Sequence, residues 1–516
     1  EDGSSAVRSL SFGGHPFLSN SSRNRAMEVT NELRWYAGNN KHALKLMTNI
    51  RHEQFTVDQG ANLYGSFSFN SLADLELGRP ASFGRVLFAP KQEGSQVTGA
   101  MSFGDFWRPT PSVQIQYGLR VDGNHFLSAP DLNPGIESKF GVRNDQVPNR
   151  VYVSPRFGFT WIYGTAQQIS FMPGAARPPR ALIQGGIGLF QNMSASSLIS
   201  GAVNNTGLPG STQQVSCVGP AAPVPDWSGY RANPDAIPTQ CADGSGGTVF
   251  SNSTPSISLF DPAYRQSRAW RTNLNWGGPV VDNRFAFGAS VLYSLNLNQP
   301  GSVDINLNRD VRFTLGNEAG RPIYANPGAI DPRTGAVASR DTRVTTDFLR
   351  VNESRSDLRS DARQLVLTLR PVTANPKLKW TAMYQLLALR DRYRGFSSTT
   401  GDPFSLQWGQ SQQAGRHTFG FGFESFPIFD VVYVSWSVSA TSGQRYTPSI
   451  AGDVNGDGGY GNDRAYIFDP ATTTDAAVSA GMQSLLARGS SGTRACLKAQ
   501  LGKLASRGSC SSPWTM

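Results

Sequence analysis

The chain lacks any long apolar run. No stretch of its 516 residues approaches the roughly 18 consecutive apolar residues that a membrane-spanning helix needs. Hydrophobic residues make up 39% of the sequence, and the mean hydropathy is -0.33. These values exclude helical membrane spans. They do not exclude a membrane protein made of strands, because a strand needs only every second side chain to face lipid.

Histidine is scarce, with five residues scattered along the chain. The sequence contains no Gly-x-Ser-x-Gly elbow, no His-Glu-x-x-His pair and no phosphate-binding loop. Carboxylates are plentiful in the expected loops, so a pair of glycosidase carboxylates stays an open alternative. We expect a protein that is not an enzyme.

Cysteine is also rare, and its four residues form two local pairs inside long expected loops. No C-x-x-C motif and no histidine cluster accompanies them, so a zinc site is not favoured. Disulfides formed in an oxidising compartment fit this pattern better. Three pairings are possible, and we favour the two local ones, Cys217–Cys241 and Cys496–Cys510.

The charge is unbalanced, with a formal net charge of +10 that comes mostly from arginine. Such a balance is compatible with nucleic-acid binding. The arginines are dispersed, however, and form no compact basic patch. Arginines that line a polar lumen or pair with anionic lipid are the better interpretation, and we expect no nucleic-acid partner.

What the sequence has instead is alternation between apolar and polar residues. Side chains of a strand point to opposite faces in turn, so an alternating segment forms a ribbon with one apolar and one wet side. The clearest example is the segment 285–298, which places on one face Phe285, Phe287, Ala289, Val291, Tyr293, Leu295 and Leu297.

Such segments occur in pairs, which predicts six hairpins. Turns are expected at 38–41, 108–111, 277–279, 371–377 and 427–429, where Gly, Asn or Pro favour tight connections. Residues 383–389 could instead form a short helix. The predicted strand pairs are 27–37 with 42–56, a strand ending at 106–107 with 113–121, 151–162 with 181–190, 268–276 with 285–298, 363–370 with 378–389, and 417–426 with 430–440.

Long polar loops separate the pairs, at 122–150, 191–267, 299–362, 391–416 and 441–514. One end of the sheet therefore has short turns and the other has long loops. Outer-membrane barrels have this asymmetry, whereas a soluble sandwich or propeller does not require it. We predict an all-β, antiparallel transmembrane β-barrel of the outer-membrane type with long external loops. An interfacial belt is expected from Trp35, Trp107, Trp276, Trp380 and Trp436, which lie near strand ends.

Several short motifs carry a family resemblance. Residues 103–111 (FGDFWRPTP) and 116–122 (QYGLRVD) resemble the "D-x-W-R-x-T-P … Y-G-L-R-Y-D" hairpin of TonB-dependent receptors. Residues 154–159 (SPRFGF), 185–190 (GGIGLF) and 442–447 (SGQRYT) resemble further motifs of these receptors, with Arg445 where Pro is usual. Residues 453–458 (DVNGDG) with 462–465 (NDRA) are similar to a loop of the Oar-like branch.

The resemblance implies a receptor in the bacterial outer membrane that takes up a substrate too large or too scarce for porins. Its implied partners are outer-membrane lipid, an unknown extracellular ligand captured by the loops, and the TonB complex acting through a plug. Two alternatives stay open: a structural or adhesive barrel that binds glycan or protein through its loops, and a soluble secreted β-protein.

The chain also departs from that family. Complete receptors have about 22 strands, a plug and a TonB box, whereas residues 1–516 show about a dozen strands and neither of the other features. The first residue is Glu1, and no signal peptide follows it. We therefore expect an incomplete barrel, an internal or C-terminal fragment that lacks the plug and has open edges.

Two candidate sites lie in the loops. Asp453, Asn455 and Asp457 alternate as the oxygen ligands of a calcium loop do, and Asp463 follows, but Arg464 stands where a bidentate Glu is expected. The alternative is a loop of Asx turns without metal. An aromatic ligand surface is a second candidate, although the same side chains could instead pack the loops together; its residues are Trp408, Tyr446, Tyr460 and Tyr466.

Overall fold

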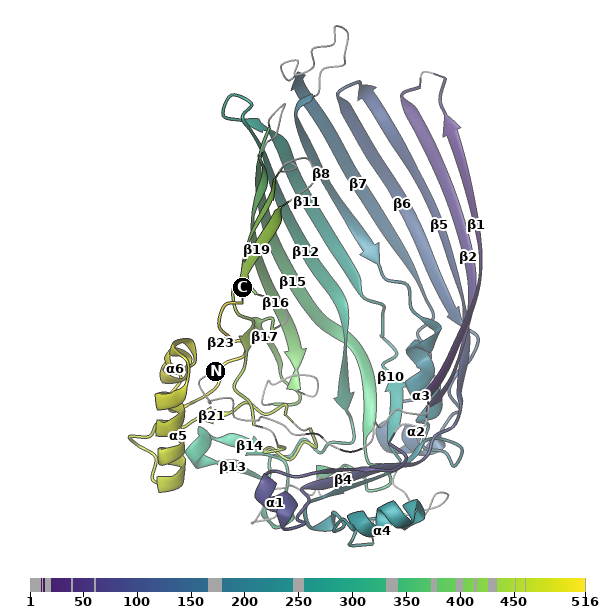
Figure 1. The fold of residues 1–516 in the computed structure, drawn as a ribbon. Helices are drawn as coiled ribbons and strands as arrows, with labels where there is room; N and C mark the ends of the chain where they lie inside the picture. Colours follow the sequence, from purple (N-terminus) through teal and green to yellow (C-terminus); the bar gives the residue numbers. More distant parts are fainter. Residues whose placement is uncertain are drawn as a thin grey trace.

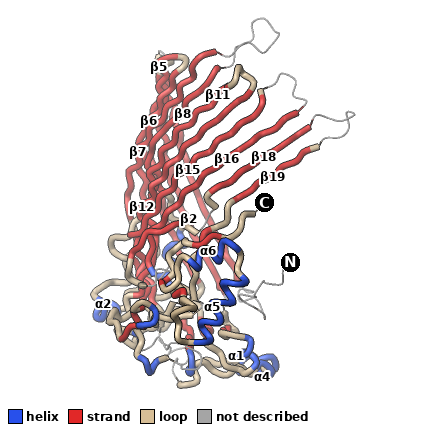
Figure 2. Tube along the Cα trace, turned by 90° about the vertical axis from the view of Figure 1, so that its left-hand side faces the viewer, coloured by secondary structure: helices blue, strands red, loops and turns tan. Residues whose placement is uncertain are grey.

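The computed structural model shows one long, curved sheet with a layer of folded loops at one end (Figures 1 and 2). The structure describes residues 11, 13, 20–38, 40–59, 62–165, 179–244, 255–330, 342–372, 378–395, 402–412, 415–425, 434–450, 452–459 and 461–515.

In the described residues the sheet has 14 strands, and its main path follows the chain with each strand antiparallel to the next. All six predicted hairpins are confirmed, and residues 378–389 are strand rather than helix. The main path, in order, is β1 (Asn20–Tyr36), β2 (His42–Gln59), β5 (Gln92–Thr110), β6 (Val113–Phe126), β7 (Arg150–Thr165), β8 (Pro179–Gln191), β11 (Arg268–Val280), β12 (Phe285–Asp304), β15 (Val351–Pro371), β16 (Leu378–Arg394), β18 (His417–Ser425) and β19 (Ser435–Thr441).

One predicted turn is wrong. Gly277, Gly278 and Pro279 remain in β11, where Gly277 pairs with Gly288 of β12. The turn lies at 281–284, with positive φ at Val281, Asp282 and Asn283. Gly and Pro favour turns, but pairing with β12 keeps these three residues extended.

Other predicted turns lie close to their observed positions. Strand β5 continues through Thr110, so the turn expected at 108–111 begins later than predicted, after a register shift between Trp107 and Thr110. The predicted turn at 427–429 and the strand residues 430–433 lie outside the described residues, as do most of the 371–377 turn and Asn39 of the first turn.

The two faces of the sheet differ in chemistry. The face that we call the lumen face carries ion pairs between neighbouring strands, such as Glu28–Arg51 at 3.2 Å and Glu32–Lys45 at 2.7 Å. The opposite face, which we call the lipid face, exposes apolar side chains, as a membrane barrel requires. These include Met27, Val29, Leu33, Trp35, Ile50, Met101, Leu119, Val153, Leu274, Val291, Phe421 and Val438.

The long connections form a folded loop layer at the lower end of the sheet in Figure 1. Its strands are β3 (Ser66–Ser68), β4 (Ser82–Phe88), β9 (Gln213–Val218), β13 (Phe313–Leu315), β14 (Arg321–Ile323), β20 (Arg445–Tyr446), β21 (Tyr466–Ile467), β22 (Lys503–Leu504) and β23 (Cys510–Ser511). Two further strands of the long connections, β10 (Ile257–Phe260) and β17 (Leu406–Gln410), pair with β15 and β16 and complete the 14 strands of the sheet. Its helices are α1 (Leu72–Glu76), α2 (Pro134–Phe140), α3 (Ser200–Asn204), α4 (Trp227–Ala232), α5 (Ala476–Arg488) and α6 (Ser491–Lys498), with 3-10 turns at Ser196–Ile199, Gly219–Ala221, Pro234–Ala236, Gly316–Glu318 and Pro327–Ala329.

The observed bounds correct the expected loops. Strand β12 runs to Asp304 and β15 begins at Val351, so both ends of the expected 299–362 loop are strand. Strands β10 and β17 lie inside the expected loops 191–267 and 391–416. The connection between β2 and β5, which was not expected to be a long loop, contributes β3, α1 and β4 to the loop layer.

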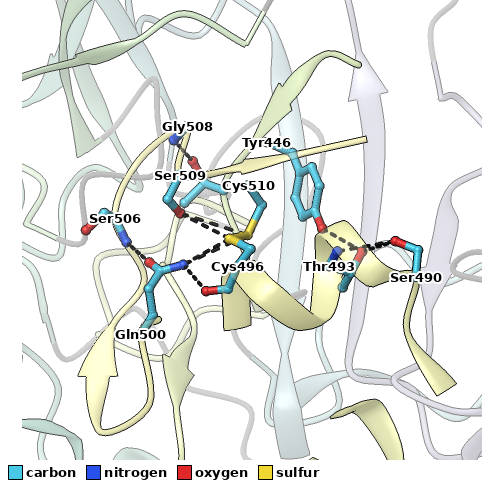
Figure 3. Close-up of a disulfide and its surroundings, with 10 residues drawn as sticks. Tyr446, Ser490, Thr493, Cys496, Gln500, Ser506, Gly508, Ser509 and Cys510 are labelled. Atoms are coloured by element: carbon cyan, nitrogen blue, oxygen red, sulfur yellow. Dashed lines mark hydrogen bonds between the residues drawn. A yellow bond between two sulfur atoms is a disulfide. The ribbon is translucent and has the colours of Figure 1, made fainter. Parts of the chain in front are cut away.

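The loop layer has small cores and two disulfides. One core joins residues from distant segments, namely Ile136, Ile257, Leu259, Phe348 and Val351. The disulfide Cys217–Cys241 lies in a second core with Phe83 and Val215. Cys496 of α6 pairs with Cys510 of β23 (Figure 3). Both local pairings that the sequence favoured are present.

The sheet is open between its first and last strands. Strand β1 pairs with β2 and β19 pairs with β18, and the described pairings include none between β1 and β19. The predicted incomplete barrel is therefore what the structure shows. None of the described helices has the length and hydropathy of a membrane-crossing helix.

Candidate functional site

The loop 453–463 is built around the carboxylate of Asp453. Its Oδ1 accepts hydrogen bonds from the backbone N–H groups of Gly456 at 2.8 Å and Asp457 at 3.1 Å. Its Oδ2 accepts one from Gly458 at 2.8 Å. Gly456 and Gly458 have φ of 76° and 83°, a region that glycine enters without steric cost. The Asn-Gly-Asp-Gly sequence therefore lets the backbone wrap around one buried carboxylate.

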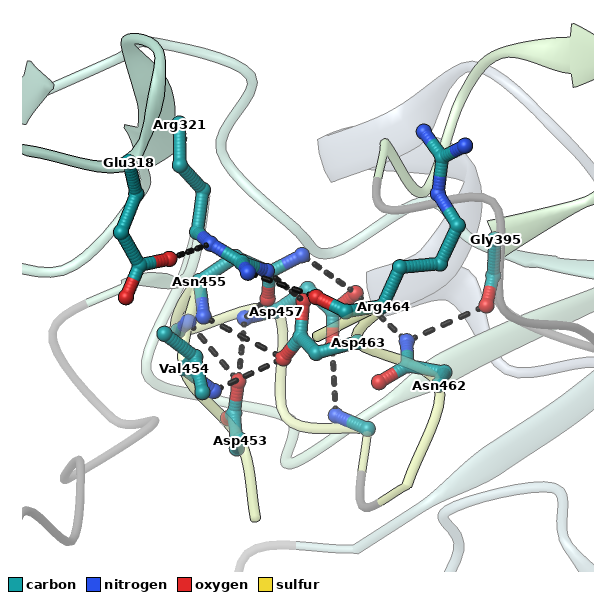
Figure 4. A network of polar contacts seen from close by, with 12 residues as sticks. Glu318, Arg321, Gly395, Asp453, Val454, Asn455, Asp457, Asn462, Asp463 and Arg464 are labelled. Carbon is teal, nitrogen blue, oxygen red and sulfur yellow. Dashed lines mark hydrogen bonds and ion pairs between the residues drawn. The ribbon is translucent and has the colours of Figure 1, made fainter. Parts of the chain in front are cut away.

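The other polar residues of the motif converge on the same loop (Figure 4). Asp463 Oδ2 accepts from the backbone N–H of Val454 at 2.7 Å. Asp457 Oδ2 accepts from the side-chain amides of Asn462 at 2.8 Å and Asn455 at 3.2 Å. All four predicted ligands are nearly inaccessible, and Asp463 is 0% exposed. The structure thus brings Asp453, Asn455, Asp457 and Asp463 together in one loop, and their role as calcium ligands stays a prediction.

Burying three carboxyl groups together changes their acidity. Burial, reinforced by the charges of Asp457 and Asp463, raises the pKa of Asp453 to about 8. Burial raises the pKa of Asp463 to about 6, and it also raises the pKa of Asp457. At neutral pH the cluster therefore retains a proton that an exposed aspartate would have lost.

A buried arginine compensates part of this charge, and sequence reasoning missed it. Arg321 of β14 is 2% exposed. Its Nη1 lies 3.4 Å from Asp463 Oδ1, its Nε donates to Glu318 at 2.6 Å, and its Nη2 donates to the carbonyl of Arg464 at 2.6 Å. Arg350 also donates to the carbonyl of Gly458. No spacing rule links Arg321 to a loop so far along the chain, so no sequence signal could have found it.

The carboxylates point mainly to backbone N–H groups. Within the described ranges, no group of three or more His, Cys, Asp or Glu side chains is arranged to hold a metal ion. One buried acceptor is left over: Asn462 Oδ1 has no hydrogen-bond partner in the described part, although its residue is only 9% exposed. The guanidinium of Arg464, at the position of the expected Glu, donates instead to the carbonyl of Ala505 at 3.2 Å.

The predicted aromatic residues are held by separate contacts. Tyr446 Oη lies 3.3 Å from Thr493 Oγ1 (Figure 3), and the ring of Tyr466 packs edge-on against Phe468. Trp408 is 43% exposed, and the Arg390 guanidinium lies over its ring at 5.5 Å. Tyr460 lies outside the described residues. Tyr446 and Tyr466 therefore contribute to packing of the loop layer, whereas Trp408 offers an open ring.

The five tryptophans of the predicted belt lie on the lipid face near the short turns. Trp35 and Trp436 are exposed. Trp276 Nε1 donates to Tyr163 Oη at 2.8 Å, and Trp107 stacks on His42. The Trp380 ring lies between Phe285 and Phe421. Rings of this kind, with an apolar body and a polar edge, suit the boundary between lipid and water.

The chain resembles known proteins in structure more than in sequence. No curated protein matches the chain. Solved structures that resemble this chain include the outer membrane transporter YddB from Escherichia coli, with 7% identity and a TM-score of 0.45 over 84% of this chain and 43% of that one. Another is the FrpB iron transporter from Neisseria meningitidis (F3-3 variant), with 11% identity and a TM-score of 0.41 over 83% of this chain and 44% of that one. A ferric enterobactin receptor from Pseudomonas aeruginosa is 10% identical in sequence, with a TM-score of 0.41. The match covers 84% of this chain and 43% of the receptor.

The chain thus spans less than half the length of these structures. The family model described as "Outer membrane beta barrel domain" matches residues 3–481. That match covers the whole sheet, from β1 to β19, and places the protein in the outer membrane, as the alternating strands and long loops predicted. The chain belongs to the outer membrane beta barrel domain family.

Proposed function

We propose that this chain forms part of the barrel of a receptor that takes up a substrate across the outer membrane with energy from the TonB complex. One observation carries the proposal: the connections between strands are short at one end of the sheet, and the other end carries a folded, disulfide-bonded loop layer. A structured external layer can present a binding surface, whereas simple hairpin loops need no internal cores. The contact with TonB would run through a plug domain.

The test compares what cells remove from their medium. Three strains are grown in the same complex medium: wild type, a strain without the protein, and a strain without TonB. Mass spectrometry of the spent medium shows which compounds persist. We expect at least one compound that wild-type cells remove and both mutants leave behind. A compound that persists only in the strain without the barrel protein would contradict TonB dependence.

The exposed ring of Trp408 favours one alternative, an adhesive barrel that binds glycan or protein without transport. Aromatic rings often carry binding energy at such surfaces. Under this alternative, loss of the protein would reduce attachment of cells to a glycan-coated surface and leave the composition of the spent medium unchanged. Trp408→Ala would have the same effect on attachment.

We also propose that calcium stabilises the loop 453–463. The support is the mutual charge of Asp453, Asp457 and Asp463, which are buried in one loop, together with the unsatisfied Oδ1 of Asn462 beside them. The carboxylates now accept backbone N–H groups and would have to turn towards the ion. A divalent cation would replace the retained proton, since carboxylates bind metal only when ionised. Calcium at pH 8 should protect this loop from proteolysis, and magnesium, which demands stricter geometry, should protect it less. Equal cleavage with calcium and with chelator would contradict the proposal.

A further inference from the structure

The lumen face carries a row of three basic residues and three glycines. In each antiparallel pair the register places the two residues directly opposite each other, so the row crosses six neighbouring strands on one face. From β2 to β11 the row consists of Lys45, Gly104, Gly118, Arg156, Gly188 and Arg271.

The glycines leave a hollow in this face. A Cβ at Gly188 would lie 3.1 Å from both Arg156 Cγ and Phe190 Cε2, and a Cβ at Gly118 would lie 2.8 Å from the carbonyl oxygen of Phe103. A side chain at Gly118 or Gly188 would therefore collide with neighbouring atoms of the sheet or fill the space above the lumen face. The resulting hollow has a volume of about 550 Å³, and the amides of Gln116, Gln184 and Asn273 line it.

The charge in the hollow is positive and only partly compensated. Lys45 pairs with Glu32 at 2.7 Å, and Arg120, which also lines the hollow, pairs with Asp122 at 2.8 Å. In the described part of the chain, no carboxylate pairs with Arg156 or Arg271. These two guanidinium groups therefore supply positive charge without an ion-pair partner among the described residues, with Asp122 acting on Arg156 only from beyond ion-pair distance.

The one acidic residue that lines the hollow, Asp105, does not neutralise them. It neighbours Gly104 in β5, so its side chain points to the lipid face, where Asp105 Oδ2 lies 2.7 Å from His42 Nδ1 and accepts from Tyr117 Oη at 2.9 Å. The charge imbalance on the lumen face thus stays in place.

The two guanidinium groups are held beside the same ring. The Cζ atom of Arg156 lies 4.5 Å from the centroid of Phe190, and that of Arg271 lies 5.6 Å from it. The ring contact restricts both long side chains and keeps two like charges close together. An anion placed between them would relieve their repulsion, and the planar forks of arginine suit the oxygens of carboxylate or phosphate.

We propose that this hollow binds a small organic ligand through an oxyanion group, carboxylate or phosphate, held by Arg156 and Arg271. The volume lies within the range of about 300–1,000 Å³ that small-molecule sites occupy, which favours a small molecule over a protein segment. The neutral amides of Gln184 and Asn273 are placed to hydrogen-bond the remainder of the ligand. The proposal does not rest on TonB-dependent uptake, because a barrel without transport could bind the same anion.

The experiment measures binding of two probes, pyrophosphate and citrate, to the protein purified from outer membranes in detergent. Isothermal titration calorimetry is performed on wild type and on the double variant R156Q/R271Q. We expect the variant to bind at least one probe about tenfold more weakly or worse, since hydrogen bonds between charged groups are lost. Comparison of the two probes shows whether phosphate or carboxylate is preferred.

A matched control removes two positive charges from the same face, nearer the short turns. This control is R370Q/K379Q, and we expect it to bind like wild type. The variant R156K/R271K, which retains charge but not the planar fork, should bind with intermediate affinity. Far-ultraviolet circular dichroism shows whether each variant has folded. The proposal is overturned if wild type binds neither probe, if R156Q/R271Q binds like wild type, or if the control loses affinity equally.

Discussion

Arg321 connects β14 to the Asp453–Asp463 loop through a single buried side chain. It contacts Asp463, Glu318 and the backbone of Arg464. Without it, Asp463 and Glu318 would lose their main cationic partner inside the loop layer. Removing one member of a buried ion pair is costly because the remaining charge stays desolvated. Loss of Arg321 should therefore destabilise the contact between β14 and the Asp453–Asp463 loop.

We predict that Arg321→Gln lowers the free energy of local unfolding of this layer by about 3 kcal/mol or more. Hydrogen exchange of the 452–459 backbone should accelerate accordingly, because those N–H groups bond to the carboxylates. Arg488→Ala, at an exposed arginine in the last turn of α5, is the control and should leave exchange unchanged. Equal exchange in both variants would show that Arg321 does not hold the loop.

The pH dependence of the same loop follows from its raised pKa values. Because the pKa values of Asp453 and Asp463, about 8 and about 6, exceed the ordinary value of 3.8, the folded loop binds protons more tightly than the unfolded loop. Its stability is therefore greatest at a pH below about 4 and falls as pH rises towards 8.

In calcium-free buffer, proteolysis of the loop should accelerate by about tenfold or more between pH 5 and pH 8.5, since one pKa unit corresponds to about 1.4 kcal/mol. The variant Asp453→Asn cannot lose the proton and should show a flatter profile. A wild-type loop that is more resistant at pH 8.5 than at pH 5 in that buffer would contradict the assignment.

At the scale of the strand, the alternation of faces makes adjacent residues of β15 differ in their tolerance of charge. Leu365 pairs with Val291 on the lipid face, and Gln364 pairs with Leu292 on the lumen face. Leu365→Arg should destabilise the folded barrel by about 2–4 kcal/mol, whereas Gln364→Arg should be nearly neutral. Urea titration of unboiled gel mobility in lipid vesicles measures both. Equal destabilisation by the two substitutions would refute the face assignment.

The strands and their faces could be predicted because alternation is a local property. Strand β12 begins at Phe285, where the sequence placed it. Its far end, Asp304, could not be predicted, because Val303 is buried in the loop layer and no longer follows the pattern of a lipid-facing strand. The turn at 281–284 was misplaced because Gly277 and Pro279 have local preferences that sheet pairing overrides.

For the loop layer, the sequence predicted only the length and the polarity of the connecting segments, and not their folded cores. Its cores join residues that are distant in sequence, such as Ile136 with Ile257 and Phe348, and such contacts leave no periodic trace. The same distinction holds for the site. The carboxylates of the 453–463 loop form a local motif and were found, whereas Arg321 reaches them from another segment and was not.

At the scale of the whole molecule, the open sheet leads to a prediction about closure. A closed barrel leaves no strand edge unpaired and therefore stays folded in a denaturing gel until it is boiled. If the strands close into a barrel, protein extracted from membranes should therefore migrate differently in boiled and unboiled samples. Within the described residues, the outer edges of β1 and β19 have no strand partner, apart from the bridge between Thr441 and Thr515. We expect this chain alone to aggregate without a mobility shift, and a clear shift would show that it closes unaided.

Strand β10 links the loop layer to the wall in a way that has a mechanical consequence. It runs parallel to the first residues of β15, from Ile257 opposite Val351 to Phe260 opposite Ser354. Because the two strands run in the same direction and β15 continues into the wall after Ser354, a pull away from the wall on the chain before Ile257 loads these hydrogen bonds together in shear. A force applied to this segment of the loop layer is therefore transmitted along β15 into the membrane, instead of being absorbed by the bonds opening one at a time.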